Sequence, residues 1–180
     1  MVLFSFPVVL IGVLCIAAIL WLLITYNLFV VLRNRCTNSR AQIDIQLKRR
    51  YDLVPKLVRA VREYSRHEQE TFHRVTEART RAIDASSITE QSEAESSLSG
   101  ALKSLFAVAE GYPDLKADQN FLKFQDELIE TEDKIRFARQ FYNDTVMRFN
   151  TTRETFPNIM LAKLFRFREE AFFNPDKTPS

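Results

Sequence analysis

One pair of side chains in this chain has the spacing of a metal-binding motif. Glu70 and His73 form a Glu-x-x-His pair, which dinuclear iron proteins supply from each of two helices of a bundle. His67 and His73 are the only histidines and fall on the same predicted helix, so a second such pair cannot form. Zinc proteases need a histidine four residues after the first, and position 71 is a threonine. We therefore expect a solvated helix surface here, with no metal ion and no cofactor.

Residue types that serve as nucleophiles are placed no better. The serines cluster in a polar stretch that we expect to be a loop, and Cys15 lies in an apolar run. Glycine occurs only at positions 12, 100 and 111, which leaves no glycine-rich elbow or phosphate-binding loop. Cys15 and Cys36 are too far apart along one helix to form a disulfide. The sequence therefore predicts a protein that is not an enzyme.

Polar side chains also fall on the inward face of a helix predicted over residues 118–150. They are Gln125, Glu132 and Arg139. A charge among apolar neighbours must be paired, because an uncompensated buried ion costs several kcal/mol. The candidate partners on the first long helix are Arg50, Arg59 and Arg62. We expect these residues to fix the helix register, and a polar binding site inside the bundle is the alternative.

Three amides accompany the exit from an apolar N-terminal run: Asn27, Asn34 and Asn38. Polar side chains on an otherwise apolar helix can set its register or its self-association. Homo-oligomerisation is therefore one of the partnerships that the sequence leaves open.

The elements that must position these residues are helices. Apolar residues recur at intervals of three and four from Ile43 to Ala82, which is the spacing of a buried helical stripe. Pro55 lies inside this stripe, and we expect a kink or a tight break there, because proline removes a backbone donor. The polar residues 85–93 predict a connecting loop with a serine or threonine as N-cap of the next helix.

Two further breaks, at Gly111-Tyr112-Pro113 and at Phe156-Pro157, flank the helix over residues 118–150. No strand-like alternation is present. The sequence predicts an all-α fold, in which an N-terminal transmembrane helix continues into an antiparallel four-helix bundle. The expected divisions are an anchor at residues 1–32, a bundle at residues 33–165 and a partly disordered C-terminal tail at residues 166–180.

Residues 1–32 contain no charged side chain, and a transmembrane helix needs only about 20 apolar residues. A cleaved signal peptide is the rival interpretation. It is disfavoured because residues 1–7 contain no Lys or Arg and the apolar run has no Ala-x-Ala boundary. Leu14 also precedes Cys15 where a lipoprotein signal has a small residue. We expect a retained anchor.

Charge is distributed unevenly after the anchor. Residues 33–66 contain ten Lys or Arg against three Asp or Glu, whereas residues 67–180 contain fifteen against twenty. The positive-inside rule then places the C-terminal side in the cytoplasm and the N-terminus outside. The basic stretch either pairs with the acidic helices or contacts anionic lipid headgroups, at about 1 kcal/mol per residue. A net charge of only +2 argues against nucleic acid as a partner.

Several segments resemble the LemA family. They are QIDIQLKRRYDLVP at residues 42–55, AVAEGYPDLKA at residues 107–117, Glu130-Thr131-Glu132, Ala138-Arg139-Gln140-Phe141-Tyr142-Asn143, Tyr26-Asn27 and Phe156-Pro157. Arg40 and Glu63 depart from the family, which usually has tryptophan and glycine there. The resemblance implies one N-terminal membrane helix, a soluble four-helix bundle and a bacterial envelope protein, with some relatives in internal membranes such as those of magnetosomes. It implies no reaction.

The expected function is a non-enzymatic scaffold or adaptor, anchored by a single pass in the bacterial inner (cytoplasmic) membrane, with the bundle in the cytoplasm. The expected partners are the lipid bilayer and other proteins. The alternative is a membrane-surface or membrane-remodelling protein that acts through its basic juxtamembrane helix. Candidate structural or partner-binding residues are Asn27, Asn34, Arg50, Glu132 and Arg139.

Overall fold

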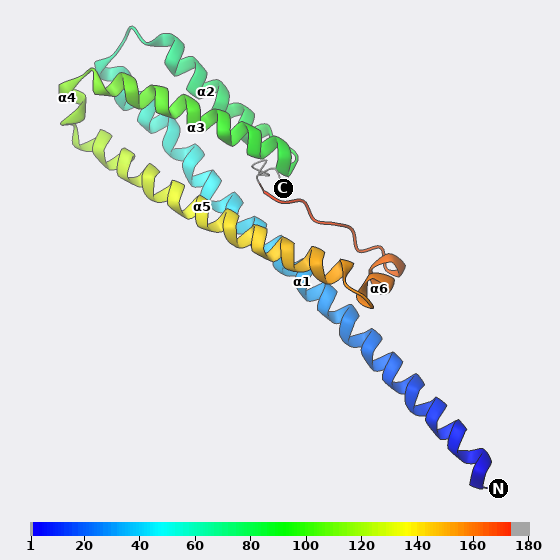
Figure 1. Ribbon diagram of the computed structural model, residues 1–180. Coiled ribbons are helices and arrows are strands. Elements are labelled where there is room, and N and C mark those ends of the chain that lie inside the picture. Colours follow the sequence, from blue (N-terminus) through cyan, green and yellow to red (C-terminus); the bar gives the residue numbers. More distant parts are fainter. Residues whose placement is uncertain (1, 174–180) are drawn as a thin grey trace. The chain divides into compact units, whose positions relative to one another are not determined.

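The computed structural model describes residues 2–173, with side chains from Val9 onward. Within these residues the chain is helical, without a strand. The helices are α1 (Val2–Tyr64), α2 (Gln69–Asp84), α3 (Ile88–Glu110), α4 (Pro113–Lys116), α5 (Gln119–Glu154) and α6 (Asn158–Leu164) (Figure 1). The predicted all-α helical fold, with a long apolar N-terminal helix, is confirmed.

The chain forms two compact units, and each contains part of α1 and part of α5. Unit 1 takes in the chain up to Asn38 together with Asp144–Glu170. Unit 2 takes in Ser39–Asn143 and the chain from Ala171 onward. The predicted bundle, residues 33–165, is therefore divided between the two units.

Unit 2 is built on four long helical segments that alternate in direction. They are the C-terminal part of α1, then α2, α3 and the N-terminal part of α5, and α2 and α3 lie side by side (Figure 1). Short connections enforce this order.

The start of α3 is fixed by a pair of hydrogen bonds. The Ser87 hydroxyl accepts a hydrogen bond from the backbone N–H of Glu90, and the Glu90 carboxylate accepts one from the N–H of Ser87. This capping box confirms the predicted serine or threonine N-cap and starts α3 at Ile88. The loop predicted over residues 85–93 is therefore too long, because residues 88–93 belong to the helix.

We predicted a kink or a tight break at Pro55; α1 continues through it, so the break does not occur, and the kink stays a prediction. In a helix, the missing N–H of Pro55 leaves the carbonyl oxygen of Tyr51 without its donor four residues on. The side chain of Arg79 on α2 supplies a substitute, because its Nε donates to the Tyr51 oxygen at 2.7 Å. The proline ring itself is exposed, while Val54 and Leu57 beside it are buried. A tertiary contact therefore repairs what the local sequence disrupts.

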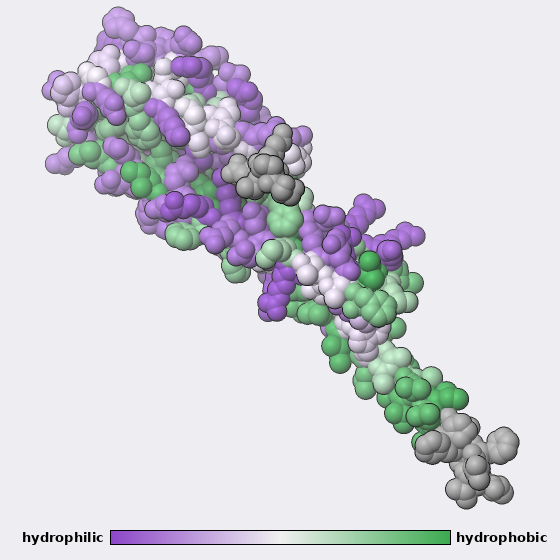
Figure 2. Space-filling model, in the orientation of Figure 1, coloured by the Kyte–Doolittle hydropathy of each residue, from purple (hydrophilic) through white to green (hydrophobic). Residues whose placement is uncertain are grey.

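In unit 1 the N-terminal part of α1 changes its surroundings at Thr25. The described side chains before Thr25 are nearly all exposed, whereas Thr25, Phe29, Leu32 and Cys36 are buried. The exposed part is mostly hydrophobic (Figure 2). Among the described residues, α1 is the one helix whose length and composition could cross a membrane.

Side-chain amides of α5 hold the segment that follows α6. In unit 1, the Asn150 amide donates to the carbonyl oxygen of Glu170 at 2.9 Å and accepts from its N–H at 3.1 Å. In unit 2, the Asn143 amide makes the same pair of hydrogen bonds to Phe173, each at 2.8 Å. These contacts order residues of the predicted tail up to Phe173. Residues 174–180, to which the prediction of disorder also applied, lie outside the described residues.

Candidate functional site: a buried charge cluster beside a groove

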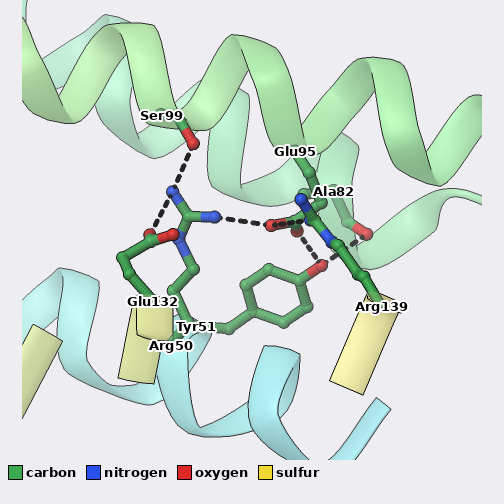
Figure 3. Close-up of polar contacts among 7 residues, drawn as sticks. All are labelled: Arg50, Tyr51, Ala82, Glu95, Ser99, Glu132 and Arg139. Atoms are coloured by element: carbon green, nitrogen blue, oxygen red, sulfur yellow. Dashed lines mark hydrogen bonds and ion pairs between the residues drawn. The ribbon is translucent and has the colours of Figure 1, made fainter. Parts of the chain in front are cut away.

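Arg50 of α1 is the centre of a polar cluster inside unit 2 (Figure 3). Its side chain is 1% exposed. One guanidinium nitrogen donates to Glu95 of α3 at 2.7 Å. The other donates to the Ser99 hydroxyl of α3 and lies against Glu132 of α5, each at 2.8 Å. The planar fork of a guanidinium suits several acceptors at once, so this one residue ties three helices together.

Glu95 is the second member of the cluster, and its side chain is also 1% exposed. Its Oε2 accepts a hydrogen bond from Arg50, and its Oε1 accepts one from the Tyr51 hydroxyl. The same hydroxyl oxygen lies 3.2 Å from the backbone oxygen of Ala82 at the end of α2. Burial, together with the hydrogen bond and negative charge of Glu95, raises the pKa of Tyr51 well above its usual range. Tyr51 therefore stays a neutral hydrogen-bond donor.

Arg139 of α5 completes the cluster (Figure 3). Its guanidinium lies 3.6 Å from Glu95, too far for a hydrogen bond, and packs over the Phe173 ring at 4.6 Å. Burial lowers the pKa of Arg139, and the charge of Glu95 opposes that shift. Arginine remains charged near neutral pH even so. Charge attraction and the aromatic face hold this side chain.

The charges of the cluster cancel. Arg50 and Arg139 carry two positive charges, and Glu95 and Glu132 carry two negative ones. Removing one partner of a buried ion pair costs about 3–5 kcal/mol, because the other charge is left buried without compensation. The cluster is therefore suited to fixing how α1, α3 and α5 pack.

The structure brings together three of the five residues singled out in the sequence. Arg50, Glu132 and Arg139 meet around Glu95. Asn27 and Asn34 belong to unit 1, and both are exposed. Their expected roles in register or self-association stay predictions.

Of the candidate partners for Glu132, Arg50 is the one that pairs with it. Arg59 and Arg62 are exposed, and the Arg62 guanidinium packs over the Phe72 ring at 5.1 Å. Gln125 is half-buried. Among the residues that the structure describes, no three His, Cys, Asp or Glu side chains come together as metal ligands.

Sequence reasoning missed Glu95 and Ser99, although a signal for Glu95 was present. Leu98, Leu102 and Leu105 form a buried stripe on α3, and Glu95 extends it one turn toward the N-terminus. Glu95 has the helical spacing of the leucine stripe on α3, and Arg50 has that of the buried stripe on α1. Two opposite charges at such inward positions on two helices indicate a buried ion pair.

A groove of about 380 Å³ opens between α3 and α5 on one side of the cluster. Its apolar lining comes from Leu102, Phe106, Leu128 and Ile129, and its polar lining from Arg50, Ser99, Lys103 and Glu132. Glu132 is 41% exposed and carries the negative charge of the cluster to the groove. The site thus combines an apolar surface with a charged end.

Comparison with known proteins identifies the family to which this sequence belongs. The sequence pattern of the LemA family matches residues 39–179. The chain belongs to the LemA family. The matched region of this LemA-family protein includes every residue of the charge cluster, and the predicted resemblance is confirmed.

Individual relatives differ in how much of the chain they share. A Protein LemA from Metamycoplasma hominis is 31% identical over 128 residues, which are 69% of this chain and 57% of that protein. Magnetosome protein MamQ 2 from Paramagnetospirillum magneticum is 25% identical, and Magnetosome protein MamQ from Magnetospirillum gryphiswaldense is 22% identical. Each of these matches covers 88% of this chain and 68% of the relative. The chain therefore spans little more than half the length of the LemA relative. The family and the candidate span together fit a membrane-associated helical protein.

Proposed function

We propose that this LemA-family protein is a non-enzymatic scaffold, which a single α1 span anchors in a membrane and which binds a protein partner in the α3–α5 groove. The observation that carries the proposal is the apolar groove bounded by the charge cluster. Apolar side chains of an amphipathic partner helix would fill it, as in other helix-in-groove complexes. A basic residue of that helix would face Glu132, which is 41% exposed.

The chemistry of the cluster supports a binding role over a catalytic one. General acid–base catalysis needs a group whose pKa lies near the working pH. The raised pKa of Tyr51 keeps its hydroxyl neutral. Glu95 is occupied by Arg50 and Tyr51. The cluster therefore positions helices and offers no obvious proton to transfer.

Basic residues after the span support a cytoplasmic location for the bundle, at the inner membrane of a bacterium. Arg33 and Arg35 are exposed and follow the apolar run directly. Lys and Arg near the end of a span favour the cytoplasmic side. A reporter enzyme fused after Ser180 is expected to be active in the cytoplasm, and activity only on the outer side would contradict this orientation.

Site-specific photo-crosslinking in living cells tests the scaffold role. A photoreactive amino acid replaces Ile129 in the groove, where the side chain is 54% exposed. The matched control replaces Ile83 on α2, which is 47% exposed and does not line the groove. We expect one discrete protein adduct at position 129 and none at position 83. Equal adducts at both positions, or catalytic turnover by the purified protein that is lost in Glu132→Ala, would overturn the proposal.

A second candidate function is favoured by the exposed basic residues of α1. Arg33 and Arg35 follow the apolar run closely enough to attract anionic lipids, which suits a membrane-surface or membrane-remodelling protein. Two of the relatives named above are magnetosome proteins. The full-length protein, reconstituted into vesicles with and without anionic lipid, is expected to deform only the anionic vesicles if this function holds. Unchanged vesicles in both cases would remove it.

A further inference from the structure

The surface of α6 in unit 1 carries large apolar side chains that no other described residue covers. Phe156 is 77% exposed, Met160 is 63% exposed and Leu164 is 69% exposed. Met160 and Leu164 are four residues apart on α6 and therefore lie on one side of it, and Phe156 belongs to the turn before the helix. On the other side, Leu161 and Ala162 are buried. Single exposed apolar residues are ordinary on a protein surface, but a contiguous row of them marks a contact with another apolar phase.

Aromatic contacts hold this segment against α1. The Phe165 ring meets the Tyr26 ring edge-on at 5.0 Å, and Phe167 stacks on Phe29 at 4.8 Å. Phe29 also meets Phe149 of α5 at 6.3 Å. These rings cover one side of α1 from Thr25 onward, whereas Leu28 and Val31 on α1 stay exposed. The segment is therefore fixed to one level of α1.

That level coincides with the end of the candidate span. A helix rises about 1.5 Å per residue, so the part of α1 from Val2 to Ile24 is about 35 Å long. The hydrocarbon layer of a bilayer is about 30 Å thick. If this part crosses the layer, Tyr26 lies at the boundary with the headgroups, and α6 lies there with it.

The charges around α6 suit an anionic surface. Residues 155–168 include Lys163, Arg166 and Arg168, all exposed, and no Asp or Glu. Hydrophobic and hydrophilic side chains lie next to each other in this part of the surface (Figure 2). Interfacial helices combine an apolar side that enters the edge of the acyl chains with basic residues at lipid phosphates.

We propose that α6 and the turn before it form a second membrane contact, which lies in the headgroup region of the leaflet where α1 emerges. Phe156, Met160 and Leu164 enter the edge of the hydrocarbon layer, and the basic residues contact anionic headgroups. This contact involves neither the α3–α5 groove nor the basic residues of α1. A fault in the scaffold proposal would leave it untouched.

Fluorescence quenching by lipid tests this contact on the full-length protein in nanodiscs. Trp21 is the only tryptophan, so Trp21→Phe gives a dark background. Met160→Trp then reports on α6, and Ile83→Trp on α2 is the matched exposed control. We expect the tryptophan at position 160 to be blue-shifted, and to lose fluorescence when the lipids carry a spin label near the headgroup. The tryptophan at position 83 should show neither change.

Two further outcomes are decisive. Adding Lys163→Glu and Arg166→Glu should reduce the quenching at position 160 in discs with anionic lipid, and have less effect in zwitterionic discs. An unquenched, red-shifted tryptophan at position 160 overturns the proposal. So does disulfide crosslinking of two copies through Met160→Cys in discs, because the apolar row would then be covered by a second protein chain.

Discussion

Units 1 and 2 share two long helices but are stabilised by different interactions. In unit 1, α1 is covered by aromatic rings, with Phe29 between Phe149 and Phe167. In unit 2, the same helix places Arg50 at the centre of an ion network. An apolar core tolerates exchanges between apolar side chains of similar volume, whereas a buried ion depends entirely on its partners. Single substitutions should therefore damage unit 2 more than unit 1.

The largest effect is expected from Glu95→Gln. The change removes the one negative charge that both Arg50 and Arg139 approach, so Arg139 loses its counter-ion and the buried Arg50 keeps only Glu132. We expect the free energy of unfolding to fall by about 3–5 kcal/mol, measured by denaturant titration of the protein in detergent. Glu93→Gln, at an exposed position on the same helix, should change it by less than about 0.5 kcal/mol. Equal effects of the two changes would show that the network does not hold unit 2 together.

The Arg50→Lys change keeps the positive charge but removes the planar guanidinium group. A single ammonium group cannot reach Glu95, Ser99 and Glu132 in the geometry of the guanidinium, so hydrogen bonds are lost while the ion pairing partly survives. We expect a loss of about 1–3 kcal/mol in the same titration. If Lys at position 50 were as stable as Arg, the network would act through charge alone.

Asn143 and Asn150 allow the two units to be compared with one chemistry. Each amide satisfies both backbone groups of one residue, Phe173 in unit 2 and Glu170 in unit 1. Replacing either by Ala should cost about 1–2 kcal/mol and expose the freed amide to solvent. Hydrogen exchange should accelerate at Phe173 in Asn143→Ala and at Glu170 in Asn150→Ala. Acceleration of both amides in each variant would mean that the segment is released as one piece.

The smallest effect is expected from Tyr51→Phe, at about 1 kcal/mol near neutral pH. Its value lies in the pH dependence. Because the fold raises the pKa of Tyr51, the unfolded chain loses the phenolic proton near pH 10 while the folded chain still holds it. The contribution of Tyr51 is thus complete below about pH 10 and declines above it. Between pH 9 and 11 the wild type should lose more stability than Tyr51→Phe, and parallel losses would contradict the raised pKa.

Sequence patterns predicted the parts of this molecule that depend on neighbours along the chain. The inward positions of Glu132 and Arg139 follow from helical spacing, and the need for a cation opposite Glu132 follows from electrostatics. The choice of Arg50 over Arg59 and Arg62 does not, because it depends on which faces of α1 and α5 meet.

The features that were missed depend on residues far apart in sequence. Glu95 meets Arg50 across 45 positions, and Asn150 meets Glu170 across 20. The start of α3 was missed for a local reason, since Ser87 and Glu90 read equally well as loop residues until their reciprocal hydrogen bonds are seen.

The hydrogen bond from Arg79 to the carbonyl oxygen of Tyr51 makes α1 depend on the packing of α2. Near Pro55, a backbone carbonyl of α1 accepts its hydrogen bond from a side chain of α2. If a partner or a membrane drew α2 aside, the carbonyl would lose that donor, and α1 would have its weakest point there. The packing of α2 thus stabilises α1 at Pro55, so the continuity of the longest helix depends on a contact from a shorter one.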